Sequence, residues 1–104
     1  MASNRLEILK NMVSQNPGDS RTRYMLAMEL ANTGDLEAAF QEYAALIAGD
    51  PGYAYAYYHG GQALEKLGRV VEAREMYLRG VEAADRTGDA HARDELQRAL
   101  GQLS

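Results

Sequence analysis

The stretch PGDSRTRYMLAMELANTGD, residues 17–35, returns in outline as PGYAYAYYHGGQALEKLGR at residues 51–69. The two Pro-Gly pairs lie 34 residues apart, and further identities recur at this offset without a gap. The matching pairs are Pro17 and Pro51, Gly18 and Gly52, Tyr24 and Tyr58, Leu30 and Leu64, Gly34 and Gly68, Ala39 and Ala73, and Tyr43 and Tyr77. Because these identities fall on turn-formers and on spaced apolar positions, they indicate an internal repeat.

Within each block the apolar residues follow a helical period, as in the i, i+3, i+4 series Leu36, Ala39, Tyr43, Leu46 and Ile47. The sequence Thr33-Gly34-Asp35 interrupts this period. Gly34 is suited to the left-handed conformation that ends a helix, and Asp35 is suited to cap the next one. Leu67-Gly68-Arg69 repeats the break. Each block therefore predicts two antiparallel helices.

A further helix is expected on each side of the two blocks. The first opens with a candidate capping box, Asn4 to Glu7, and points Leu6, Leu9, Met12 and Val13 inward. The last carries a stripe of Ala92, Leu96, Ala99, Leu100 and Leu103, set about two residues late against the repeat. The expected helices cover residues 4–15, 20–33, 36–48, 54–67, 70–86 and 90–102. One domain, 1–104, is expected, with a capping helix in 1–17, repeats in 18–51 and 52–87, and a capping helix in 88–104.

The 34-residue helix-turn-helix period and the residues that fill it resemble the tetratricopeptide repeat family. The matching residues are Leu26, Ala27, Leu30, Ala39, Tyr43 and Pro51 in one block, and Tyr57, Gly61, Leu64, Ala73 and Tyr77 in the other. The resemblance implies an all-α solenoid of antiparallel helix pairs in a right-handed superhelix. Three residues depart from the family pattern: Arg23 replaces a large aromatic residue, Gly60 a leucine and Gly80 a small apolar residue. The two glycines predict a softer second repeat, whereas the aliphatic stem of Arg23 is expected to cover its site.

Composition excludes several classes of function. The 104 residues carry a net charge of −4 and no cysteine, which argues against a nucleic-acid partner, disulfides and thiolate metal sites. The sequence shows no signal peptide and no apolar run long enough to span a membrane, so a cytoplasmic location is expected.

Catalysis is not expected either. The only histidines, His59 and His91, lack metal-ligand spacing, and a solvent-facing imidazole is the simpler interpretation of His59. Gly60-Gly61 lies inside a predicted helix without a phosphate-loop context. Glu72, Arg74, Glu75, Arg79 and Glu82 are interpreted as a solvated helix face. No catalytic residue, cofactor or metal site is predicted.

The resemblance implies that the first helices of successive repeats line a concave groove. The candidate partner-binding residues in it are Arg21, Tyr24, Met28, Asn32, Tyr55, Tyr58, His59, Gln62 and Lys66. Met25 shares this face and is expected to pack on a neighbouring helix. The family's carboxylate clamp is absent, since Tyr24, Met28 and His59 occupy its positions. The predicted ligand is a peptide or helix of a partner protein with apolar or aromatic anchors.

Within residues 53–62, the angle of 100° per residue points Tyr53 and Tyr57 toward the core and Tyr55 and Tyr58 toward the groove. Two alternatives to partner binding stay open. One is that the chain is an assembly element that associates with itself, for example as a homodimer, through an exposed end helix that carries Leu96, Leu100 and Leu103. The other, more remote, is an unrecognised enzyme.

Overall fold

The computed structural model describes residues 2–103, so the predictions for Met1 and Ser104 lie outside the described part of the chain. It contains six helices: α1 (Ala2–Gln15), α2 (Ser20–Asn32), α3 (Leu36–Gly49), α4 (Ala54–Lys66), α5 (Val70–Thr87) and α6 (Ala90–Gln102). No strand occurs between residues 2 and 103. The predicted all-α class is confirmed, and the predicted helix bounds differ from the observed ones by two residues at most.

The ends of the helices follow from local chemistry. Aspartates at positions 19, 35 and 89 cap α2, α3 and α6, each accepting a hydrogen bond from a backbone N–H of the first helical turn. Gly34, Gly68 and Gly88 have φ values of 91°, 79° and 72°, a conformation that glycine adopts without strain. The caps expected at Gly34 and Asp35 are thus confirmed.

The first helix differs from its prediction. It begins at Ala2, so Asn4 lies inside α1 and the predicted capping box is wrong. Leu9 and Val13 are buried as expected, but Met12 is 43% exposed. In the described residues α1 packs against α2 alone, so only one stripe of its surface is covered.

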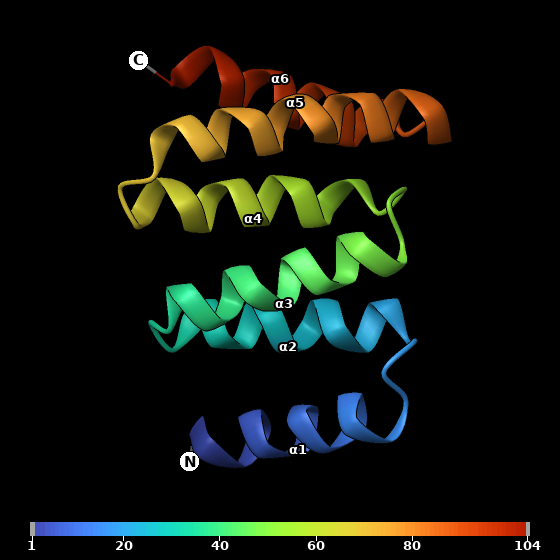
Figure 1. The fold of residues 1–104 in the computed structure, drawn as a ribbon, viewed down its shortest axis with the longest axis vertical. Coiled ribbons are helices and arrows are strands. Elements are labelled where there is room, and N and C mark those ends of the chain that lie inside the picture. Colours follow the sequence, from blue (N-terminus) through green and yellow to red (C-terminus); the bar gives the residue numbers. More distant parts are fainter. Residues whose placement is uncertain (1, 104) are drawn as a thin grey trace.

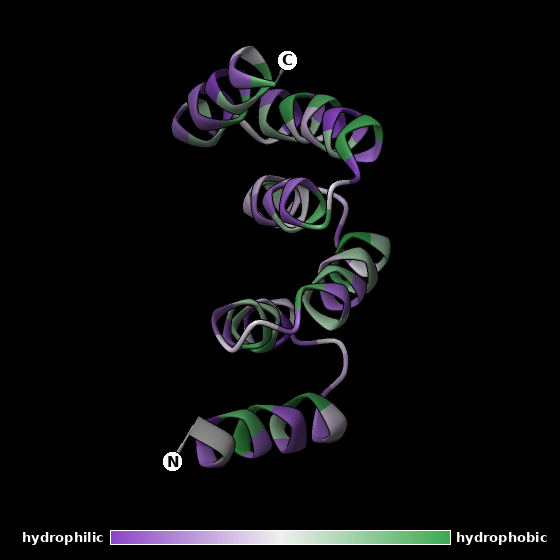
Figure 2. Ribbon diagram, turned by 90° about the vertical axis from the view of Figure 1, so that its left-hand side faces the viewer, coloured by the Kyte–Doolittle hydropathy of each residue, from purple (hydrophilic) through white to green (hydrophobic). Residues whose placement is uncertain are grey.

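The helices stack as antiparallel neighbours along one long axis (Figure 1). Seen end-on, α2, α4 and α6 lie on one side of the stack and α3 and α5 on the other (Figure 2). The helices α2 and α4 also contact each other directly, as do α4 and α6. This arrangement brings the faces of three non-consecutive helices together on one side of the molecule.

Two glycines let the second repeat pack closely. A Cβ atom at Gly61 would lie 2.7 Å from Cδ1 of the buried Tyr77 ring. A Cβ atom at Gly80 would lie 2.6 Å from Tyr57 Cβ and 2.7 Å from Leu96 Cδ2. Both positions therefore exclude any larger side chain. The missing side chain at Gly80 leaves the space that Leu96 fills, so this glycine is not a packing defect.

The burial of Leu96 argues against self-association through the leucines of the last helix. Leu96 is completely buried, and Leu100 and Leu103 pack partly buried against the core. This stripe therefore holds α6 on the solenoid, and the expectation that it forms an exposed interface is wrong.

Arg23, which departs from the repeat pattern, makes the same kind of contact as its counterpart Tyr57. Tyr57 donates a hydrogen bond from its hydroxyl to the carbonyl of Pro51, at 2.7 Å. At the matching position in the first repeat, Arg23 donates from Nη2 to the carbonyl of Pro17, at 3.3 Å, and pairs with Glu42 at 2.8 Å. Arg23 and Tyr57 thus both fasten the turn six residues before them, by different side-chain chemistry.

Candidate functional site

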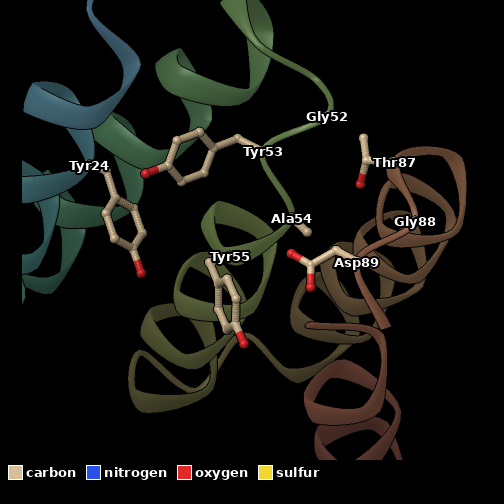
Figure 3. A pocket seen from close by; sticks show the side chains of 8 residues that line it. All are labelled: Tyr24, Gly52, Tyr53, Ala54, Tyr55, Thr87, Gly88 and Asp89. Atoms are coloured by element: carbon tan, nitrogen blue, oxygen red, sulfur yellow. The ribbon is translucent and has the colours of Figure 1, made fainter. Parts of the chain in front are cut away.

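Two hollows lie on the side formed by α2, α4 and α6. The first, here called the tyrosine hollow, has a volume of about 620 Å³ (Figure 3). It is lined by Tyr24, Gly52, Tyr53, Ala54, Tyr55, Thr87, Gly88 and Asp89. The second, here called the histidine hollow, has a volume of about 210 Å³. It is lined by Met28, Ala31, Asn32, Leu36, Tyr43, His59, Gln62, Ala63 and Lys66.

The structure brings most of the predicted groove residues into these hollows. Tyr24 and Tyr55 line the tyrosine hollow. Met28, Asn32, His59, Gln62 and Lys66 line the histidine hollow. Arg21 is exposed, and neither Arg21 nor Tyr58 lines a hollow; the partly buried Tyr58 ring contacts those of Tyr55 and His59. Met25, which shared this face in the sequence pattern, instead lines a separate hollow against α1.

His59 connects the two hollows through ring contacts. Its centroid lies 5.1 Å from that of Tyr58 and 5.7 Å from that of Tyr24, and it stacks on Tyr43 at 6.2 Å. His59 Nδ1 lies 3.3 Å from Oε1 of Gln62, a distance that suits an Nδ1–H donor. The imidazole is half-buried among tyrosines, so the interpretation of His59 as solvent-facing is wrong.

This setting favours the neutral imidazole. Burial lowers the pKa of His59 below its usual 6.5, and the hydrogen bond with Gln62 and the charge of Glu95 oppose that shift only in part. The groove centre therefore presents an uncharged ring at neutral pH, able to exchange hydrogen bonds and to stack.

Two tyrosines of the groove, Tyr24 and Tyr43, also stay neutral. Burial raises the pKa of Tyr24 to about 12, with smaller contributions from Tyr53 and Tyr55. Burial likewise raises the pKa of Tyr43, which forms the floor beneath Tyr24 and His59. None of these hydroxyls is activated for proton transfer near neutral pH, and each keeps a polar handle on an apolar ring.

Several site residues were missed by sequence reasoning. Tyr53 was assigned to the core, and it does pack partly buried against it, but its ring also lines the tyrosine hollow, 5.1 Å from that of Tyr24. Asp89, the N-cap of α6, lines the same hollow, and the ring centroid of His91 on α6 lies 6.2 Å from that of Tyr55. The late stripe of the last helix was the available signal: α4 begins at Ala54 and α6 at Ala90, so the equivalent groove positions lie 36 residues apart, not 34.

The described residues hold no group of three or more histidine and acidic side chains arranged as a metal site. No helix between residues 2 and 103 combines the length and apolar character needed to cross a bilayer. The acidic and basic residues expected on the outer face of α5 are mostly exposed there.

Comparison with known proteins identifies the family of the repeat. The family described as Tetratricopeptide repeat matches the chain twice, over residues 20–52 and 54–87. An uncharacterised protein of Methanocaldococcus jannaschii is 38% identical over 58 residues, which cover 56% of this chain and 67% of that protein.

Two solved structures show the same arrangement of helices. The tetratricopeptide repeat domain protein of Salinibacter ruber is 34% identical and superposes with a TM-score of 0.80, covering 86% of this chain and 90% of that one. YrrB, described as a TPR protein with an unusual peptide-binding site, is 29% identical with a TM-score of 0.78. That match covers 93% of this chain but 48% of YrrB.

Proposed function

The chain belongs to the tetratricopeptide repeat family, and from this we propose that it is a non-catalytic module that binds a peptide or helix of a partner protein. The binding site is the groove on α2, α4 and α6, which comprises the tyrosine hollow and the histidine hollow. YrrB, which is similar over most of this chain, is described as having a peptide-binding site, and that description supports the proposal.

The half-exposed aromatic surface is the main support for a protein ligand. Tyr24, Tyr53, Tyr55, Tyr58 and His59 are each only partly buried, and a chain of ring contacts joins them across α2 and α4. His91 on α6 extends this chain through its contact with Tyr55. Tyrosine is enriched in protein interfaces because it offers a large rigid contact area with a hydroxyl at its end. A folded core does not require five such rings on one open face, so the surface suits a protein ligand.

The size of the groove sets the expected affinity. Two hollows of about 620 and 210 Å³ hold a few side chains of an extended or helical segment, not a folded domain. We therefore expect a dissociation constant on the order of micromolar.

A double variant, Tyr55→Ala with Tyr58→Ala, tests the function. Both rings are partly buried and contact each other edge-on, and neither belongs to the fully buried core, so helicity by circular dichroism is expected to persist. Quantitative affinity capture is expected to retain a specific partner with the parent chain and to lose it with the double variant.

The matched control removes apolar surface from the opposite side. Val71 and Leu78 on α5 are 73% and 51% exposed, so Val71→Ala with Leu78→Ala is expected to leave capture unchanged. Capture that survives the tyrosine double variant, or that is lost equally with the control, contradicts a groove-bound partner.

A second candidate function, self-association into a homodimer, is favoured by one observation at the opposite end of the stack. Ile8 and Met12 on α1 and Met25 on α2 are large apolar residues, 58%, 43% and 36% exposed, around a hollow of about 450 Å³. A second copy of the chain would cover this apolar surface. Sedimentation at high micromolar concentration is expected to show a dimer that Ile8→Glu dissociates, and a monomeric parent chain rules this candidate out.

A further inference from the structure

We propose that the tyrosine hollow holds a positively charged side chain, arginine or lysine, of the bound segment. This inference rests on the proposed function, because it assigns one anchor of the groove's peptide ligand. The hollow brings three tyrosine rings and one carboxylate around a common space, with the Asp89 carboxylate turned toward Tyr55 (Figure 3).

The aromatic walls are suited to a cation. Tyr24 and Tyr53 lie with ring centroids 5.1 Å apart at an angle of 42°, and Tyr55 adds a third ring from the first turn of α4. The face of an aromatic ring carries negative charge density and attracts an ammonium or guanidinium group within about 6 Å. A volume of about 620 Å³ accommodates a guanidinium group together with its aliphatic stem.

The carboxylate of Asp89 supplies the counter-charge. It accepts a hydrogen bond from Ala92 N at 3.0 Å as the cap of α6, which fixes its position. Within residues 2–103 no arginine or lysine forms an ion pair with it. Burial raises the pKa of Tyr55, and the negative charges of Asp89 and Glu95 raise it further, so both carboxylates lie near this ring.

Other charged groups act on the hollow from outside its lining. Burial raises the pKa of Tyr53, Arg21 lowers it, and Asp50 and Asp19 raise it, which places two carboxylates and one guanidinium near that ring. The first turn of α4 has no side-chain cap, so its free N–H groups add a partial positive charge.

Counted together, the four carboxylates around the two rings outweigh Arg21, the end of α4 and Arg86, which donates a hydrogen bond to the Pro51 carbonyl beside the hollow. An anion in the hollow would face this net negative charge, whereas a cation would be attracted by it. The charge balance therefore favours arginine or lysine over a phosphate group or a carboxylate.

Small probes test the charge preference directly. In an ¹⁵N-resolved NMR titration of the full chain, N-acetylarginine amide is expected to shift the backbone signals of Tyr53, Tyr55 and Gly88. The expected dissociation constant is on the order of millimolar. N-acetylcitrulline amide has the same shape without the charge and is expected to bind at least about fivefold more weakly. Equal shifts with citrulline, or stronger shifts with N-acetylglutamate amide, overturn the inference.

A pair of variants isolates the counter-charge. Asp89→Asn keeps a side chain that caps helices well but removes the charge, and it is expected to weaken N-acetylarginine amide about fivefold. Asp35→Asn makes the same change at the cap of α3, outside the hollow, and is expected to leave the affinity unchanged. Equal effects of the two variants overturn the assignment of Asp89.

The two proposals fail in different ways. If partner capture depends on Tyr55 and Tyr58 while N-acetylarginine amide does not bind, the groove function stands and the cation anchor is wrong. If N-acetylarginine amide binds in an Asp89-dependent manner but capture ignores the tyrosine variants, the hollow is a cation site and the groove function is wrong.

Discussion

Adjacent glycines in α4 offer a sharp test of the packing described above. Gly60 and Gly61 are both buried in the same helix. The test replaces each of them separately by alanine. A Cβ atom at Gly60 would meet Tyr43 Cβ at 3.4 Å and Met76 Cε at 3.8 Å, which are ordinary contacts. A Cβ atom at Gly61 would lie 2.7 and 2.8 Å from Cδ1 and Cζ of Tyr77, and closer still to Cε1. The two substitutions therefore share their chemistry and differ only in what the new methyl group meets.

The magnitudes follow from two opposing effects. Replacing glycine by alanine inside a helix stabilises it by about 1 kcal/mol, because the unfolded chain loses conformational freedom. At position 60 this gain is expected nearly in full, so Gly60→Ala raises the free energy of unfolding by about 0.5–1 kcal/mol. At position 61 the overlap with the ring adds a cost of at least about 1–3 kcal/mol. The Tyr77 ring cannot move aside easily, because it is fully buried and its hydroxyl donates a hydrogen bond to Glu65.

Urea denaturation followed by circular dichroism at 222 nm measures both effects. For a domain of this size, 1 kcal/mol corresponds to about 4–5 °C in melting temperature, so a thermal scan gives an independent reading. Because the propensity gain is common to both variants, we expect them to differ by the cost of the overlap, at least about 1–3 kcal/mol, with Gly60→Ala the more stable. Equal shifts, or a stabilising Gly61→Ala, would show that the close approach of α4 and Tyr77 is not real.

Three further perturbations have expected outcomes. Gly80→Ala forces a Cβ atom against Tyr57 and Leu96 and is expected to destabilise by about 1–3 kcal/mol in urea, with an unchanged midpoint speaking against this packing. Tyr57→Phe removes the hydrogen bond to the Pro51 carbonyl and is expected to lower the free energy of unfolding by about 0.5–1.5 kcal/mol; no loss in a thermal melt would mean that the bond is not formed. Burial lowers the pKa of His59, so the unfolded chain takes up a proton that the folded chain resists. The stabilising effect of the neutral His59 is therefore retained above pH 6.5 and declines as pH falls toward the lower, folded-state pKa. In unfolding experiments from about pH 7.5 to 5, His59→Gln is expected to flatten this decline. Parallel plots of unfolding free energy against pH for the variant and the parent chain would contradict this expectation.

Sequence reasoning predicted the helices well because their limits depend on local chemistry. The glycines after α2 and α4 require positive φ values, and Asp35 caps the helix that follows. The same breaks at the same spacing in two blocks left little freedom for the positions of the four central helices. The buried stripes also followed, since a helical period fixes which side chains share a face.

The groove contact of Tyr53 shows where that reasoning ends. An angle of 100° per residue applies only inside a helix, and Tyr53 is the N-cap of α4, with φ −79° and ψ 85°. Its side chain leaves the chain in a direction that no helical projection gives, and its ring meets Tyr24 in the groove. Residues just outside helices therefore escape periodicity even when the helix itself is predicted well.

His59 was misjudged for a different reason. The half-burial of His59 arises from Tyr24 and Tyr43 on two other helices. This burial depends on contacts between elements, and a single helix pattern contains no information about its neighbours.

The position of α1 has a consequence for how the molecule opens. Because α1 packs against α2 alone in the described residues, its attachment depends on Leu9 and Val13 and on an ion pair of 3.0 Å between Arg5 and Glu29. In a solenoid each unit is stabilised by its nearest neighbours, so α1 has one stabilising interface where α4 has several. Native-state hydrogen exchange should therefore find α1 as a separate cooperative unit that unfolds at a lower free energy than the other helices. Opening of this kind uncovers the far side of α2 while the aromatic groove stays assembled.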